Sequence, residues 1–130
     1  MLIPCEVAVK TVSPAIRALL AKTLIEKHDM KEIQVAQILG ITQSAVSKYF
    51  KNARGTAIPL ENVADLQPIT DKMIALLLTN PAPQPEIMAL FCQACILIRS
   101  TGLMCPICRE NQKSKLDNCD FCQKDGSNIY

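Results

Sequence analysis

The stretch KEIQVAQILGITQSAVSKYFK, residues 31–51, contains the pattern that decides the fold. Apolar residues recur at helical spacing on both sides of the tripeptide GIT, in which Gly40 can end one helix and Thr42 can cap the next. Ala36 is small enough for the two helices to approach each other closely. The apolar residues expected to fill the angle between the helices, or to face inward from the second one, are Val35, Leu39, Ile41, Val46, Tyr49 and Phe50. These features predict a helix-turn-helix, and an ordinary helical hairpin is the alternative.

The second of these helices carries many hydrogen-bonding groups on the side expected to face solvent. Gln43 and Ser44 begin it, and Ser47 follows one turn later. A glutamine can bond bidentately to adenine, and a serine can bond to a base or a phosphate. The basic side chains that follow are suited to phosphate contacts. The residues predicted to bind DNA are Thr42, Gln43, Ser44, Ser47, Lys48, Lys51 and Arg54.

Helices are also predicted on both sides of this pair. They are expected over residues 14–27, 61–66, 70–79 and 85–99. Pro14 suits the first position of a helix, Pro68 is expected to break the chain between two helices, and Gly102 is expected to cap the last one. The fold class is therefore predicted to be all-α. A helix-turn-helix DNA-binding domain would span residues 1–58, a helical connecting or dimerisation segment 59–84, and a small cysteine-rich metal-binding module 85–130.

Three CxxC pairs follow one another within 31 residues of that last module. Their members are Cys92, Cys95, Cys105, Cys108, Cys119 and Cys122. Three such pairs at nearly even spacing favour metal binding, and disulfides are disfavoured in a cytosolic chain because thiols are kept reduced there. Cys5 lies far away in sequence and is expected to be a plain buried thiol. The single histidine, His28, is expected to be a solvated or capping residue near a helix end.

Both an iron–sulfur cluster and zinc suit these cysteines, since each takes four of them. Zinc ribbons commonly have glycine after the second cysteine of a pair, whereas Ile96, Arg109 and Gln123 stand there in this chain. The aliphatic residues between the first two pairs can shield a cluster from solvent, and Arg99 can offset thiolate charge. The pattern slightly favours an iron–sulfur cluster, 4Fe-4S in type, and zinc is the alternative.

Composition and charge limit the class of protein. The chain has 130 residues, of which 49% are hydrophobic and 20% charged, and its net charge of +2 is unevenly distributed. Residues 1–58 carry eight lysines and arginines against four acids, whereas residues 59–130 carry six against eight. A basic N-terminal half is a mild indication of a nucleic-acid partner. No set of residues typical of a catalytic site stands out, so the protein is not expected to be an enzyme.

The apolar runs and the start of the chain bear on location. The longest apolar runs fall well short of the ~20 residues that a membrane span needs. The first ten residues, MLIPCEVAVK, have an early proline and an acid where a signal peptide would carry basic residues. A cytoplasmic location without membrane contact is therefore expected.

The segment PCEVAVKTVSPAIRALLAKTLIEKHDMKEIQVAQILGITQSAVSKYFKNARG, residues 4–55, resembles a family of small archaeal transcriptional regulators with a lambda-repressor-like helix-turn-helix. The likeness is strongest at LGITQSAVSKY and ARG, and it extends more loosely to FCQACILIRSTGLMCPIC. The resemblance implies an archaeal origin, dimerisation, and a role in DNA binding for Gln43, Ser44, Ser47 and Lys48.

The sequence therefore predicts a homodimeric regulator that binds double-stranded operator DNA and senses redox or iron state through a C-terminal iron–sulfur cluster. A helix-turn-helix regulator with a purely structural zinc site is the first alternative. A redox protein that uses a cluster or reactive dithiols is an alternative of another class.

Overall fold

The structure, a computed structural model, describes residues 3–80, 84–111 and 121–124. Within these ranges the chain forms helices and connections but no strand, which confirms the all-α fold class. The helices are α1 (Pro4–Lys10), α2 (Val12–His28), α3 (Glu32–Leu39), α4 (Gln43–Phe50), α5 (Leu66–Thr79), α6 (Pro85–Ser100), α7 (Cys105–Asn111) and α8 (Phe121–Lys124). No helix in the described part of the chain combines the length and apolar composition that a membrane-spanning segment needs.

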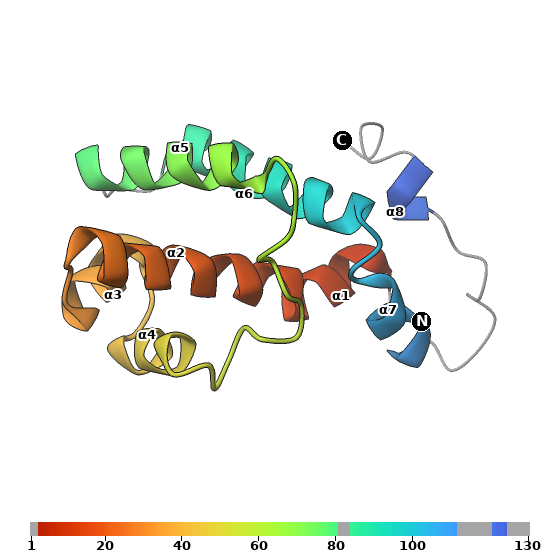
Figure 1. The fold of residues 1–130 in the computed structure, drawn as a ribbon, viewed down its shortest axis with the longest axis horizontal. Helices are drawn as coiled ribbons and strands as arrows, with labels where there is room; N and C mark the ends of the chain where they lie inside the picture. Colours follow the sequence, from red (N-terminus) through yellow and green to blue (C-terminus); the bar gives the residue numbers. More distant parts are fainter. Residues whose placement is uncertain (1–2, 81–83, 112–120, 125–130) are drawn as a thin grey trace.

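Helix α2 runs through the middle of the molecule (Figure 1). Helices α5 and α6 lie side by side on one face of α2, and α3 and α4 lie on the opposite face. Helices α1, α7 and α8 lie together at the end of the molecule where α6 ends. Because α2 has neighbours on both faces, its buried residues are spread around its surface: Val12, Ala15, Ile16, Ala18, Leu20, Ala21 and Leu24.

Helix α1 was not expected from the sequence. Pro4 occupies its first turn, where a missing N–H costs nothing because the first N–H groups of a helix have no internal acceptor. The Glu6 carboxylate accepts a hydrogen bond from the Ile3 backbone N–H at 2.8 Å, which satisfies a donor at the helix start. Val7 and Ala8 are buried and hold the helix against the rest of the protein.

Thr11 separates α1 from α2. Its backbone leaves the helical region, with φ −129° and ψ −59°, while its hydroxyl donates to the Val7 carbonyl at 2.8 Å. Helix α2 begins at Val12, slightly before the predicted start at Pro14. Pro14 still lies in the first turn, where it displaces no internal hydrogen bond.

Helices α3 and α4 lie where the sequence predicts them. Gly40 ends α3 in the left-handed conformation, with φ 68° and ψ 33°, and the Ile41 N–H bonds back to the Ala36 carbonyl at 3.1 Å. The Thr42 hydroxyl caps α4 by accepting from the Ala45 N–H at 3.0 Å. One expectation was wrong, because Phe50 is 37% exposed and does not face inward.

Two expectations about the segment after α4 were also wrong. No helix forms over residues 61–65, and the described chain continues as turns until α5 begins at Leu66. Pro68 does not break a helix but lies in the first turn of α5, where a proline is tolerated. Ile58, in the middle of this connector (residues 51–65), is buried and anchors it.

Helix α6 begins at Pro85 as predicted and ends at Ser100, one residue beyond the expected end. Gly102 follows with φ 85°, and its N–H donates to the Arg99 carbonyl at 3.1 Å. The helix packs on α2 and α5, so buried side chains from all three predicted parts of the chain form one cluster. The division at residues 58 and 84 stays a prediction.

Gly55 lies where the connector crosses α2. Its φ is 77°, and a Cβ at this position would come within 2.7 Å of the Pro14 carbonyl oxygen and 2.8 Å of the Ala18 Cβ. Both contacts are shorter than van der Waals packing allows, and the backbone conformation itself disfavours a side chain. Gly40 also has a positive φ, but nothing lies within 4 Å of its would-be Cβ. A side chain at Gly40 would therefore cause backbone strain alone, whereas a side chain at Gly55 would cause both backbone strain and steric overlap.

We expect Gly55→Ala to lower the free energy of unfolding by about 3 kcal/mol or more, since strain and overpacking add. Gly40→Ala should cost only about 1 kcal/mol, because strain acts alone there. Urea unfolding followed by circular dichroism measures both values. Equal losses for the two variants would contradict the close approach of the connector to α2.

Candidate nucleic-acid interface and cysteine cluster

The residues predicted to bind DNA lie on α4, at its cap, or shortly after its end. Of these, Ser47 is half-buried, and the other six are exposed: Thr42, Gln43, Ser44, Lys48, Lys51 and Arg54. The structure therefore brings them together along one helix, with the three basic side chains toward its C-terminal end. An exposed helix with hydrogen-bonding groups near its start and cations near its end has the composition of a helix that enters the major groove.

The opposite face of α4 is fixed in the core. Val46 is inaccessible to solvent and Tyr49 is 4% exposed, and α4 packs against both α2 and α3. Because these side chains fill the space beneath it, α4 is held rigidly while its outer face stays open. A rigid platform of this kind places polar side chains reproducibly.

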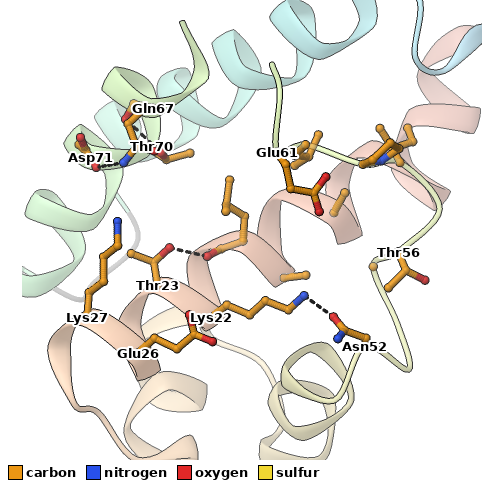
Figure 2. A pocket seen from close by; sticks show the side chains of 17 residues that line it. Lys22, Thr23, Glu26, Lys27, Asn52, Thr56, Glu61, Gln67, Thr70 and Asp71 are labelled. Atoms are coloured by element: carbon orange, nitrogen blue, oxygen red, sulfur yellow. Dashed lines mark hydrogen bonds between the residues drawn. The ribbon is translucent and has the colours of Figure 1, made fainter. Parts of the chain in front are cut away.

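The end of α4 is also tied to α2. The Lys22 ammonium donates to the side-chain oxygen of Asn52 (Figure 2). Asn52 directly follows the C-cap of α4 and has a positive φ of 59°. This hydrogen bond joins α2 to the end of α4, next to Lys51 and Arg54.

A groove of about 410 Å³ lies between α2, the connector and the start of α5. Several of its polar side chains bond to groups on their own helix: the Thr23 hydroxyl donates to the Leu19 carbonyl at 2.8 Å, and the Gln67 amide donates to Asp71 at 2.9 Å (Figure 2). The lining described for this groove includes neither histidine nor cysteine. The groove follows the line along which the connector lies against α2. The hydrogen bond between Lys22 and Asn52 lies along it.

The described cysteines come from four helices, α1, α6, α7 and α8. Cys92 is exposed and Cys95 half-buried on α6, Cys105 and Cys108 are half-buried on α7, and Cys122 is buried on α8. Cys119 lies outside the described residues. Cys5, on α1, is exposed, so the expectation of a buried thiol was wrong. His28 is exposed in the last turn of α2, as expected.

Three of these sulfurs surround the guanidinium of Arg99, a group of residues that we call the Arg99 cluster: Arg99, Cys5, Cys95 and Cys122. Arg99 is only 2% exposed. Its Nη1 lies 3.8 Å from the Cys5 Sγ, and its Nη2 lies 3.4 Å from the Cys122 Sγ. Cys95 lies one turn earlier on α6 and interacts with the same guanidinium. The buried Nε has no hydrogen-bond partner in the described part of the chain.

In the Arg99 cluster, burial and neighbouring charges shift the pKa values of Cys95 and Arg99 in opposite directions. Burial raises the pKa of the Cys95 thiol, and the neighbouring Arg99 guanidinium opposes that rise. For Arg99, burial alone would lower the pKa, but the hydrogen bond to Cys122 and the sulfurs of Cys122, Cys5 and Cys95 raise it above its ordinary value. The described groups that stabilise the Arg99 cation are therefore thiolates and not carboxylates.

This chemistry fits a thiolate-bound metal. Sulfur ligands suit both iron–sulfur clusters and zinc, a buried guanidinium can offset thiolate charge, and the unpartnered Nε indicates an acceptor that the described residues do not supply. However, no three cysteine, histidine, aspartate or glutamate side chains among residues 3–80, 84–111 and 121–124 lie close enough together to hold a metal ion. The donors therefore fit a metal centre by their chemistry, while their positions do not define its complete ligand set.

Comparison of the chain with protein-family models, with curated proteins and with solved structures found no match in any of the three.

Sequence reasoning missed the place of Cys5 in the Arg99 cluster. Cys5 and Arg99 are 94 residues apart, and no spacing rule connects a single cysteine to a pair so far away. The nearest signal was the segment PCEVAVK itself, whose proline and third-position glutamate are typical of a helix start. Recognising that helix would have placed Cys5 in its first turn.

Replacing Arg99 tests whether its charge stabilises the folded chain or instead serves to balance negative charge on the sulfurs. In the reduced, metal-free protein, we expect Arg99→Met to change the free energy of unfolding by less than about 1 kcal/mol, since an apolar side chain of similar length removes an inadequately paired charge. Arg99→Ala should cost about 2–4 kcal/mol, because it leaves a cavity. Urea unfolding gives both values. A loss in the methionine variant as large as in the alanine variant would mean that the guanidinium–sulfur contacts themselves stabilise the metal-free fold.

Proposed function

We propose that this protein is a sequence-specific DNA-binding transcriptional regulator in which α3 and α4 form a helix-turn-helix and α4 enters the major groove. The observation that carries the proposal is the contrast between the two faces of α4. Val46 and Tyr49 are buried beneath it, while Gln43, Ser44 and Lys48 stand exposed on its outer face. Gln43 and Ser44 occupy the first two positions of the helix, where recognition helices contact base edges.

The proposed DNA contacts divide into two kinds. Gln43, Ser44 and Ser47 are assigned to base edges, and Lys48, Lys51 and Arg54 to phosphates, with Thr42 at the cap next to the backbone of the DNA. Phosphate contacts supply affinity that falls with salt, whereas base contacts supply specificity. We further propose a homodimer that binds two half-sites about one helical turn apart, because one short recognition helix reads few base pairs.

We propose that the C-terminal cysteines bind an iron–sulfur cluster that makes DNA affinity responsive to redox or iron state. The Arg99 cluster supports this proposal, since a buried cation surrounded by sulfur requires negative charge from thiolates. When bound, the cluster would supply a change of charge and of stability on oxidation or loss. Structural zinc is the second candidate, because the same sulfurs and the same cation suit it.

Substitutions on α4 test the DNA contacts. The wild-type protein should select a site from a pool of random duplexes, and Gln43→Ala should weaken binding to that site by about 1–3 kcal/mol and relax selection at one base pair. Lys48→Ala and Lys51→Ala should weaken binding to all sequences, and each should reduce the slope of log affinity against log salt by about 1. Fluorescence anisotropy at several salt concentrations measures these quantities.

The control for the lysine variants is Lys72→Ala, which removes the same charge from an exposed position on α5, on the other side of α2 from α4. It should leave both affinity and salt slope unchanged. If Lys72→Ala weakened binding as much as Lys48→Ala, binding would reflect net charge alone and α4 would not be the interface. Failure to select any site would exclude sequence-specific recognition.

Metal analysis decides between the two cofactor candidates. Anaerobically purified protein should contain iron and sulfide in equal amounts and absorb in the visible range, and its affinity for the selected site should change after oxidation. Colourless, air-stable protein with zinc and without sulfide would replace the cluster with structural zinc. A loaded cluster in a protein that binds no DNA would favour the redox-protein alternative instead.

A further inference from the structure

We propose that Cys5, on α1, is a ligand of the same metal centre as the C-terminal cysteines, together with Cys95 and Cys122. The three sulfurs must draw closer together around the metal than they lie in the described structure. The inference rests on the cysteine-bound centre proposed above and goes beyond it, because it adds a ligand from the helix that leads into α2. The centre would then join two parts of the chain that are far apart in sequence.

The first step is the geometry of one guanidinium. Arg99 extends one terminal nitrogen toward Cys5 at 3.8 Å and the other toward Cys122 at 3.4 Å. Cys95 stands one helical turn before Arg99, where an i, i+4 pair shares a helix face. A single planar group thus brings the sulfurs of α1, α6 and α8 into one site.

The second step is charge. A guanidinium stays protonated at any accessible pH, and a neutral thiol is only a weak acceptor. Burying an uncompensated cation costs several kcal/mol, so the 2% exposed Arg99 requires negative partners, and its described partners are sulfurs. Metal binding converts thiols to thiolates and would supply that charge. Because Cys5 contacts the guanidinium as Cys122 does, it belongs to the same electrostatic unit.

The third step is the unpartnered Arg99 Nε, which is fully buried without an acceptor among the described residues. Buried donors of this kind are rare in folded proteins. An additional sulfur drawn toward Arg99 on metal binding would satisfy it. The Nε–H of Arg99 is thus a buried donor for which the described residues supply no acceptor.

The fourth step is the placement of α1. Val7 and Ala8 anchor its inner side, whereas Cys5 is exposed at its first turn and could bind a metal without unfolding of the helix. Helix α1 also packs against α7, which carries Cys105 and Cys108. The helix that carries Cys5 therefore contacts the helix that carries the second CxxC pair.

Alkylation of the full chain tests the inference through the exposure of Cys5. N-ethylmaleimide should modify Cys5 readily in the reduced, metal-free protein, because its thiol is exposed. In the anaerobically purified, metal-loaded protein, Cys5 and the half-buried Cys95 should react at least about tenfold more slowly, since a coordinated thiolate is no longer a free nucleophile. Mass spectrometry of the digested protein gives the rate at each cysteine.

A cysteine placed elsewhere on α1 provides the matched control. Val9 is 66% exposed on the same helix, so the thiol of a Val9→Cys variant should react equally fast with and without metal. Unchanged reactivity of Cys5 on metal loading, with the C-terminal cysteines protected, would overturn the inference. Protection of the Val9→Cys thiol to the same degree would also overturn it, because metal would then only bury α1.

A second measurement uses Co²⁺ as the probe. Cys5→Ala should weaken the sulfur-to-cobalt charge-transfer absorption of the reloaded chain and its affinity for Co²⁺, whereas Val9→Ala should change neither. Circular dichroism checks that both variants fold. Equal spectra for Cys5→Ala and the wild type would count against Cys5 as a ligand.

Site selection from random duplexes, performed on the same samples, separates this inference from the proposed function. Selective DNA binding with an unprotected Cys5 removes only the inference. A protected Cys5 without DNA binding removes only the regulator. A chain that binds neither iron nor zinc removes the cofactor and the role of Cys5 together.

Discussion

The burial of α2 is the constraint on which the rest of the structure depends. Ile16, Ala21 and Leu24 are inaccessible to solvent, and α2 packs against α1, α3, α4, α5 and α6. Its buried residues lie all around the helix, so they can be covered only if other helices pack on both of its faces. This requirement produces the layers seen in Figure 1. Small residues such as Ala21 let those neighbours approach closely. The position of α4 relative to the cysteine-bearing end is therefore set by one shared helix.

The sequence predicted the parts of the fold that local chemistry decides. The left-handed Gly40, the cap at Thr42 and the buried Val46 follow from turn, capping and periodicity rules acting within a few residues. It failed where one residue type has two roles. Pro68 was expected to break the chain, although it lies in a first turn, where a proline is tolerated. Phe50 was assigned inward by spacing alone, but α4 ends there and nothing covers it fully.

The two candidate sites differ in the same way in how far the sequence predicts them. The residues proposed for DNA binding lie on one short helix, so periodicity alone could place them together. The Arg99 cluster depends on contacts between α1, α6 and α8, and such contacts leave no periodic trace. Sequence reasoning could assign Arg99 to thiolate charge because Cys95 is only four residues away. It could not assign Cys5, because that requires knowing how α1 packs.

Placement of the two sites has an electrostatic consequence. A thiolate centre carries net negative charge, because four thiolates outweigh the charge of the metal they surround. Beside α4 such a centre would repel the phosphates that Lys48 and Lys51 are proposed to contact. The cysteines of α1, α7 and α8 instead lie at the end of the molecule where these three helices gather. Helix α6, which carries Cys92 and Cys95, lies across α2 from α4 (Figure 1). Solvent-exposed charges are largely screened beyond about 10 Å at 0.1 M ionic strength. Coupling between the proposed centre and DNA binding can also pass through the packing of the helices. A ligand on α1 provides the shortest covalent path, since α1 is joined to α2 through Thr11 alone, and α2 packs directly against α4.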